Sequence, residues 1–361
     1  MSGHEILIAV MAVFALLGAM DRVFGNRLGL GKEFEEGIQA MGSLTLAMVG
    51  IVSLAPVLAK VLEGVVVPLY RFLGADPAMF AGTILACDMG AGALALALGQ
   101  DPRAAMLGGL ITGSMLGATV VFTLPVAMGI LRPQDRPAMA RGILCGIVTV
   151  PLGVLAGGLA AGYPLSLVGR NLLPILLIAG LIALGLWRSE ETMVRGFAAF
   201  GKGVVAVSTL GLGAAVLEAL AGIVLIPGMA PISEGFATVG SIAIVLAGAF
   251  PLVKLLTRFL EKPLKALGRL LGINDVAAAG LLATLANSIA TFGMVRDMNP
   301  RGKVVNIAFA VSAAFVLGDH LGYAAGFAPE LLPAMILGKL TGGISAAALA
   351  LWLTRKEQPG G

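Results

Sequence analysis

The chain has 361 residues, of which 58% are hydrophobic and 12% are charged, a composition outside the range of soluble domains. Its net charge of +4 does not indicate nucleic-acid binding, because the Lys and Arg residues stand in short loops between apolar runs, where they usually reflect membrane orientation. Both cysteines, Cys87 and Cys145, fall inside apolar segments, which excludes a disulfide framework.

Eleven apolar segments follow one another and predict an all-α, polytopic membrane protein. The first ends at Asp21-Arg22 without a convincing cleavage site, so we expect a retained helix rather than a signal peptide. Residues 60–73 and 258–271 mix charged and apolar side chains and predict helices lying along the membrane surface. The segments lie near 5–24, 38–59, 77–98, 104–131, 140–162, 171–187, 201–226, 236–257, 276–295, 303–326 and 330–354.

The chain contains an internal duplication. We expect a first repeat at 1–165, a linker helix at 166–199 and a second repeat at 200–361, all within a single transmembrane domain. Two such repeats are typical of secondary transporters. The repeat is clearest in one motif that occurs twice at a spacing of 198 residues: Glu36-Gly37, Gly42-Ser43 and Gly50 correspond to Glu234-Gly235, Gly240-Ser241 and Gly248.

The distribution of basic residues favours one topology. If all eleven segments crossed the membrane, Lys and Arg would be balanced between the two sides, against the positive-inside rule. If the third and ninth segments instead fold back as re-entrant hairpins, only Lys60, Arg71, Arg103 and Arg170 stay outside. This predicts about nine full spans, an inverted repeat, an outer N-terminus and a cytoplasmic C-terminus in the cell membrane. Full-length helices with polar kinks are the alternative.

The third and ninth segments are interrupted at Asp88 and at Asn287-Ser288. Matching interruptions in two repeats indicate a binding site near the membrane midplane. A carboxylate there costs on the order of 3 kcal/mol, so we expect Asp88, with Cys87 beside it, to face a partner, a cavity or a substrate. A structural ion pair or a hairpin cap is the alternative. Asn287 and Ser288 could bind a polar ligand or could simply satisfy the amides freed by the break.

The tenth segment adds Asp319, His320 and Tyr323, and the eleventh adds Lys339. Helical spacing puts Asp319 and Tyr323 on one face and turns His320 about 100° away. By depth, Asp319 could pair with Lys339, or it could bind a cation. His320 could be a proton-sensitive gate, but we favour a hydrogen-bonded interior residue, because a lone histidine provides no ligand cluster.

The fourth segment carries glycines at a spacing of four, with Ser114, Thr119 and Phe122 nearby. Small residues at this spacing favour close helix packing over ligand contact, although these three side chains stay candidates for the site. Small-residue faces on segments four, five and eleven suit either a homo-oligomer contact or packing within the bundle.

Motifs of several enzyme classes do not occur. The sequence has no HExxH pair, cysteine cluster, phosphate-binding glycine loop or GxSxG elbow, so we expect a transporter without a metal or cofactor. A membrane enzyme that uses Asp88 and Asp319 as acid and base is an alternative. A scaffold that docks cytoplasmic partners is another.

Long stretches of the chain resemble the EutH family of bacterial ethanolamine-utilisation permeases, and the resemblance covers nearly the whole length. Relatives often carry a second Asn at the position of Ser288 and a Pro at that of Ala118, which weakens the case for amide recognition at 288. The matching stretches are FEEG at 34–37, LAPVLA at 54–59, MFAGTILACDMG at 79–90, GSMLG at 113–117, EKPL at 261–264, ATLAN at 283–287, RGKVVN at 301–306, AFAVSAAFVLGDHLG at 308–322 and GKLTGG at 338–343.

The resemblance implies uptake of ethanolamine. Its protonated form offers an ammonium to a carboxylate and a hydroxyl to an amide or serine, groups present at Asp88, Asp319, Asn287 and Ser288. The membrane potential could drive entry without ATP. Coupling to protons through His320, channel-like diffusion and another small organic cation as substrate are the open variants.

Overall fold

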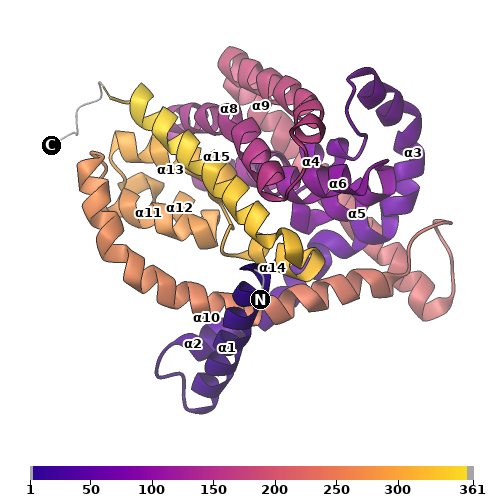
Figure 1. Ribbon diagram of the computed structural model, residues 1–361, viewed down its shortest axis with the longest axis horizontal. Helices are drawn as coiled ribbons and strands as arrows, with labels where there is room; N and C mark the ends of the chain where they lie inside the picture. Colours follow the sequence, from indigo (N-terminus) through magenta and orange to yellow (C-terminus); the bar gives the residue numbers. More distant parts are fainter. Residues whose placement is uncertain (1–2, 356–361) are drawn as a thin grey trace.

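The computed structural model describes residues 3–355, and every regular element in this range is helical (Figure 1). Within these residues, seven helices or unbroken runs of helices are long and apolar enough to cross a membrane, which confirms the predicted all-α, polytopic membrane class. Residues 1–2 and 356–361, the outer ends of the predicted repeats, lie outside the described range. The α-helices are α1 (Gly3–Val23), α2 (Leu30–Leu44), α3 (Gly50–Phe72), α4 (Met79–Ile84), α5 (Ala91–Leu98), α6 (Pro102–Met106), α7 (Leu124–Ile130), α8 (Arg136–Ala160), α9 (Leu165–Ala221), α10 (Ile232–Leu270), α11 (Asp275–Ala286), α12 (Ser288–Met294), α13 (Pro300–Ala313), α14 (Asp319–Phe327) and α15 (Leu332–Leu353).

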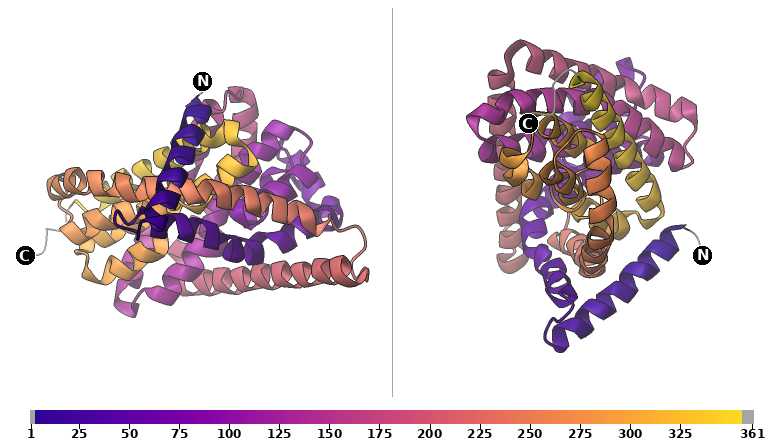
Figure 2. Two further views of the ribbon diagram at one scale, coloured as in Figure 1. Left: turned by 90° about the horizontal axis from the view of Figure 1, so that it is seen from below. Right: turned by 90° about the vertical axis from the view of Figure 1, so that its left-hand side faces the viewer.

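Some predicted segments are parts of longer helices. Residues 60–73 and 258–271 are not separate surface helices: apart from their last residues they form the ends of α3 and α10, because no turn sequence separates them from the preceding apolar run. Helix α9 has 57 residues with a kink at Ser189, so the predicted boundary between linker and second repeat falls inside it. In Figure 2, α9 and α10 run along the length of the molecule.

Hydrogen bonds join residues at the two ends of each interrupted segment. The backbone amides of Gln100 and Asp101 donate to the carboxylate of Asp76, at 3.2 and 2.9 Å. In the second half, the side chain of Asn274, which lies 198 residues after Asp76, donates to the carbonyl oxygen of Asp297 at 2.9 Å. The two ends of each segment are therefore held together by hydrogen bonds to equivalent positions of the duplication.

The two halves also contact each other reciprocally. A Cβ atom on Gly37 would lie 2.5 Å from the backbone nitrogen of Ala247, and one on Gly235 would lie 2.7 Å from the side chain of Val49. Gly235 and Ala247 follow Gly37 and Val49 by 198 residues. Contacts in which each partner repeats the role of the other are typical of a two-fold relation.

A second pair of close contacts follows the same relation. A Cβ on Gly50 would lie 1.8 Å from the carbonyl oxygen of Ser208 in α9, and one on Gly248 would lie 2.0 Å from that of Met11 in α1. The part of α9 that follows the kink at Ser189 therefore packs against α3 in the same way that α1 packs against α10. Only glycine permits this approach of two backbones.

These glycines lead to a prediction about stability. We expect Gly50→Ala and Gly248→Ala each to destabilise the protein by about 1–3 kcal/mol or more, because the added methyl group would displace a neighbouring backbone. Thermal unfolding in detergent would measure the effect. Gly42→Ala and Gly240→Ala, at equivalent places in the same motif, have nothing within 4 Å of the new Cβ and are the matched controls. Equal melting temperatures for all four variants would contradict the packing described here.

Helices α8 and α13 pack against α15 and bury its middle (Figure 1). A Cβ on Gly153 of α8 would lie 2.7 Å from the carbonyl oxygen of Gly338 in α15, and Thr149 donates to the carbonyl oxygen of Gly342 at 3.2 Å. This contact carries Lys339 into the interior, where its side chain is fully buried.

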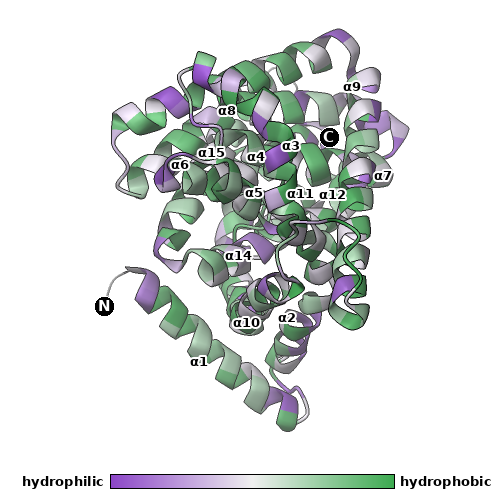
Figure 3. Cartoon of the chain, turned by 90° about the vertical axis from the view of Figure 1, so that its right-hand side faces the viewer, coloured by the Kyte–Doolittle hydropathy of each residue, from purple (hydrophilic) through white to green (hydrophobic). Residues whose placement is uncertain are grey.

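The outer surface is apolar where a lipid bilayer would meet it. Helices α1 and α2 form an arm that projects from the body (Figure 2), and α1 is hydrophobic along most of its length (Figure 3). In this helix Val13 and Leu16 are 56% and 63% exposed. Such a surface is stable in hydrocarbon and unfavourable in water.

Candidate functional site

The first helix break lies between α4 and α5, against the π-helical stretch Leu107–Gly117 that follows α6. A Cβ on Gly117 would lie 1.9 Å from the carbonyl oxygen of Leu85, and one on Gly82 would lie 1.9 Å from that of Gly108. The glycines of the fourth segment therefore allow close packing, as the spacing predicted. They hold the short turn Cys87–Met89, which carries Asp88, at a fixed depth in the bundle.

A third break, which the sequence did not predict, separates α13 from α14. Residues 314–318 leave the helix, and Phe315 adopts a left-handed φ of 62°, which is unusual for a bulky residue. Its amide donates to the carbonyl oxygen of Thr284 at 3.1 Å, and that of Leu317 donates to Leu285 at 2.8 Å. The end of α11 thus provides the hydrogen bonds that this break removes from its own helix.

Three ionisable side chains meet between these breaks. The Nζ atom of Lys339 donates to the carbonyl oxygen of Ser114 and lies 2.9 Å from Nδ1 of His320. Because an ammonium can only donate, Nδ1 must accept, and the proton of the neutral ring lies on Nε2. That atom is 3.7 Å from Oδ1 of Asp88. Lys339, His320 and Asp88 therefore form one chain of neighbouring side chains from both halves, of which Lys339 and His320 are buried and Asp88 is partly buried.

Asp319 lies at the start of α14, next to His320, and interacts electrostatically with Asp88. The bridge from Asp319 to Lys339, one of two predicted alternatives, does not form, because Lys339 is directed at His320 and Ser114 instead. Among residues 3–355, Asp319 has no ion-pair partner. The expectation that His320 has no neighbouring ligand groups was also wrong, because Cys87 and Asp88 place donor atoms within 4.8 Å of it and of each other.

Counted with both carboxylates ionised, Lys339 as an ammonium and His320 neutral, the four side chains Asp88, Asp319, His320 and Lys339 carry a net formal charge of −1. A monovalent cation would neutralise it. The cluster therefore suits a small cation that carries one positive charge.

Hydroxyl and amide groups predicted for the site have different surroundings. The hydroxyl of Ser114 donates to the carbonyl oxygen of Ile111, and that of Thr119 donates to Met115 and Val311. Both hydroxyl groups therefore already donate their proton to a backbone carbonyl oxygen.

The two residues at the second helix break, Asn287 and Ser288, have different surroundings. Asn287 caps α12 by accepting from the amide of Ile289 at 2.8 Å and is exposed. Ser288 is fully buried, and its hydroxyl has no hydrogen-bond partner in the described part of the chain. A buried hydroxyl without a partner is costly, so Ser288 is the better candidate for a ligand group at this break.

Aromatic rings surround the charged chain. The ring of Phe315 lies 5.5 Å from that of Phe122 and 5.3 Å from that of His320, between centroids. Tyr323, one turn after Asp319, stacks on Phe327 at 4.9 Å and is 1% exposed. The sequence singled out Phe122 and Tyr323 but missed Phe315, since nothing in a continuous apolar run marks it as the bend.

The chain is similar over its whole length to proteins of one family. A model of the family described as "Ethanolamine utilisation protein, EutH" matches residues 4–353. The "Probable ethanolamine permease EutH" of Listeria monocytogenes is 56% identical over 356 residues, which cover 99% of this chain and 95% of that protein. The protein of the same name from Escherichia coli is 48% identical over 392 residues, covering 98% and 96%. A Bacillus subtilis protein named YxeR is 50% identical over 354 residues, with the same coverage. No solved structure matches the chain.

Proposed function

Because the chain belongs to the EutH family of ethanolamine utilisation proteins, we propose that it is a permease that carries protonated ethanolamine across the cell membrane. Relatives are named as permeases, which are transporters rather than enzymes. Several apolar helices suit a multi-pass membrane protein. The substrate site we propose is the cluster of Asp88, Asp319, His320 and Lys339, in which His320 and Lys339 are buried and both carboxylates are partly buried.

The observation that carries this proposal is the uncompensated negative charge of the cluster. Asp88 and Asp319 come from different halves, and Lys339 alone offsets them among the residues that contact the chain of charges. A buried charge without a partner is costly, and an ammonium ion would remove that cost when it binds. Carboxylate oxygens also accept the N–H donors of a primary amine in short, charge-assisted hydrogen bonds. The free hydroxyl of Ser288 is our candidate partner for the substrate hydroxyl.

We propose that the two halves are inverted relative to each other and that the third and ninth segments are re-entrant. The reciprocal glycine contacts and the hydrogen bonds of Asp76 and Asn274 support this arrangement. The N-terminus would then lie outside and the C-terminus in the cytoplasm. Labelling of Arg71→Cys and Gln100→Cys with an impermeant maleimide checks it, since labelling of these two positions from opposite sides would exclude a re-entrant hairpin.

Uptake into proteoliposomes tests the function itself. We expect radiolabelled ethanolamine to enter without ATP and to accumulate under an inside-negative potential, because each charge gains about 2.3 kcal/mol per 100 mV. This corresponds to a concentration ratio of roughly fiftyfold at 100 mV. Liposomes without protein are the control. Uptake no faster than in these liposomes would refute the proposed permease.

A proton-coupled variant is favoured by one observation, the continuous contact from Lys339 through His320 to Asp88. An imidazole between two charged groups can transfer protons. In this variant an imposed pH gradient would drive accumulation at zero membrane potential. Uptake that responds to the potential alone would rule the variant out.

A further inference from the structure

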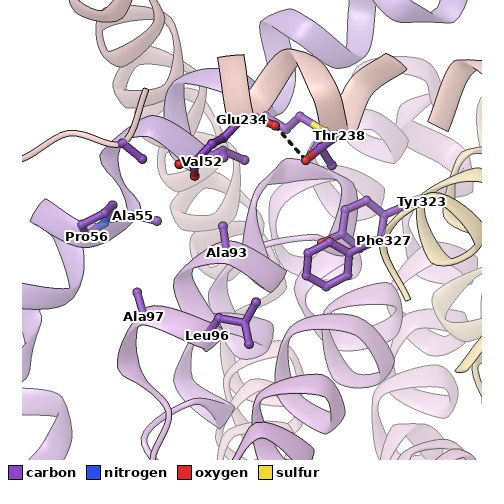
Figure 4. Close-up of a pocket in the computed structure, with 12 residues that line it drawn as sticks. Val52, Ala55, Pro56, Ala93, Leu96, Ala97, Glu234, Thr238, Tyr323 and Phe327 are labelled. Carbon is purple, nitrogen blue, oxygen red and sulfur yellow. Dashed lines mark hydrogen bonds between the residues drawn. The ribbon is translucent and has the colours of Figure 1, made fainter. Parts of the chain in front are cut away.

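A pocket of about 410 Å³ opens beside the charged cluster and is lined by both halves of the chain. Helices α3 and α5 contribute one wall, and α10 and α14 contribute the other (Figure 4). Most of its lining is apolar. Glu234, near the start of α10, provides a carboxylate at its edge, and Tyr323 and Phe327 of α14 lie in its wall.

The stacked rings of Tyr323 and Phe327 connect this pocket to the helix that carries part of the charged cluster. They line the pocket, while α14, the helix that carries them, begins with Asp319 and His320. Gly92 of α5 makes room for the pair, because a Cβ there would lie 2.2 Å from the Tyr323 hydroxyl and 2.8 Å from the Phe327 ring. The pocket and the cluster therefore share helix α14, which carries Asp319 and His320 at its start and the two aromatic side chains further on.

Glu234 is exposed and has no ion-pair partner within the described residues. Its equivalent in the first half, Glu36, pairs with Lys32 at 3.5 Å. The duplication also places Lys254 where the pocket has Pro56, and Lys254 donates to Glu33 at 2.8 Å. Within the described residues, Glu234 at the pocket therefore has no ion pair. Glu36 and Lys254, which stand at the positions equivalent to Glu234 and Pro56, each form one.

We propose that this pocket is a recruitment site for small ammonium ions, in which Glu234 provides the counter-charge and the partly exposed ring of Phe327, stacked on the buried Tyr323, provides an aromatic face. The inference rests on the proposed permease function and adds the surface from which the cation reaches Asp88. A carboxylate at the mouth of an apolar cleft raises the local concentration of cations. Aromatic faces attract an ammonium, including a quaternary one that has no N–H to donate.

Such a site accepts cations that the inner cluster does not carry. Tetramethylammonium would occupy the pocket through Glu234 and the rings, but it cannot donate hydrogen bonds to Asp88 and Asp319. It should therefore compete with ethanolamine without being transported. This separates recognition in the pocket from recognition in the cluster.

A protection assay tests the pocket without requiring transport. Ala97 is exposed and lines the pocket, and the native Cys87 and Cys145 are buried, so a maleimide should label Ala97→Cys selectively. We expect tetramethylammonium to slow this labelling severalfold. Adding Glu234→Gln should abolish the protection, whereas adding Glu36→Gln, the equivalent change in the first half, should leave it intact. Labelling that tetramethylammonium does not slow, or that Glu234→Gln does not alter, would overturn the proposal.

Uptake measurements then separate the two proposals. At low ionic strength, we expect Glu234→Gln to raise the KM for ethanolamine roughly fivefold with little change in kcat, as for loss of an exposed charge pair. Glu36→Gln should behave as wild type. Protection without any uptake by the wild-type protein would refute the permease and support the pocket. Normal uptake with an unchanged KM in Glu234→Gln would support the permease and refute recruitment by Glu234.

Discussion

Asp88→Asn and Asp319→Asn should each reduce ethanolamine uptake strongly at low substrate concentration. Each change keeps the size of the side chain but removes one of the two negative charges that the cluster offers to a cation. Loss of a charge-assisted hydrogen bond costs about 1.5–3 kcal/mol, which corresponds to roughly 10- to 100-fold weaker binding. Initial rates in proteoliposomes over a range of ethanolamine concentrations would measure the effect.

The control for these variants is Asp297→Asn, because Asp297 lies outside the cluster and its side chain is 60% exposed. It should transport at the wild-type rate. Melting temperatures in detergent distinguish a lost binding group from a misfolded protein. Wild-type kinetics in both Asp88→Asn and Asp319→Asn would exclude the carboxylates from substrate binding.

Lys339→Met should lower the free energy of unfolding more than a conservative substitution on the protein surface does. Methionine has a similar length, but the change leaves Asp88 and Asp319 without a compensating charge and removes the donor to His320 and Ser114. Removal of one partner from a buried charge pair typically costs about 3–5 kcal/mol. Thermal or denaturant unfolding in detergent micelles would report the loss.

A double variant tests whether charge balance is the cause. When Asp88→Asn is added to Lys339→Met, the cluster loses one charge of each sign, so we expect part of the stability to return. Lys202→Met, at an exposed position of α9, is the matched control for the lysine change and should unfold as wild type. Losses that simply add in the double variant would show that Asp88 and Lys339 are energetically independent.

The charge cluster links features that lie far apart in the chain. Asp88 lies at the first helix break, His320 follows the third, and Lys339 lies inside a continuous helix. Each break exposes backbone groups and requires surrounding protein to satisfy them. Under the proposed function, the same breaks that destabilise their helices give the cation access to carboxylates in the interior.

The sequence by itself determined the membrane class and two of the three helix breaks, and it predicts two repeats. Apolar runs of membrane-spanning length require helices in a bilayer, and a repeat with a constant offset of 198 residues is visible without any structure. Asp88 stood out for a local reason as well, since a carboxylate within an apolar run is costly unless it has a partner or a function. Close packing of the glycines in the fourth segment also followed from their spacing alone.

Only the tertiary structure decided the third break and the partners of the charged residues. The run that contains Phe315 has no proline or turn sequence, and its break depends on hydrogen bonds to Thr284 and Leu285 of another helix. Periodicity and hydropathy describe each segment separately, so they could place Lys339 near Asp319 in depth but could not show that it is directed at His320. Which charges meet in the interior depends on how closely glycine lets the helices approach and on how they rotate about their axes, and both are settled by packing between the halves.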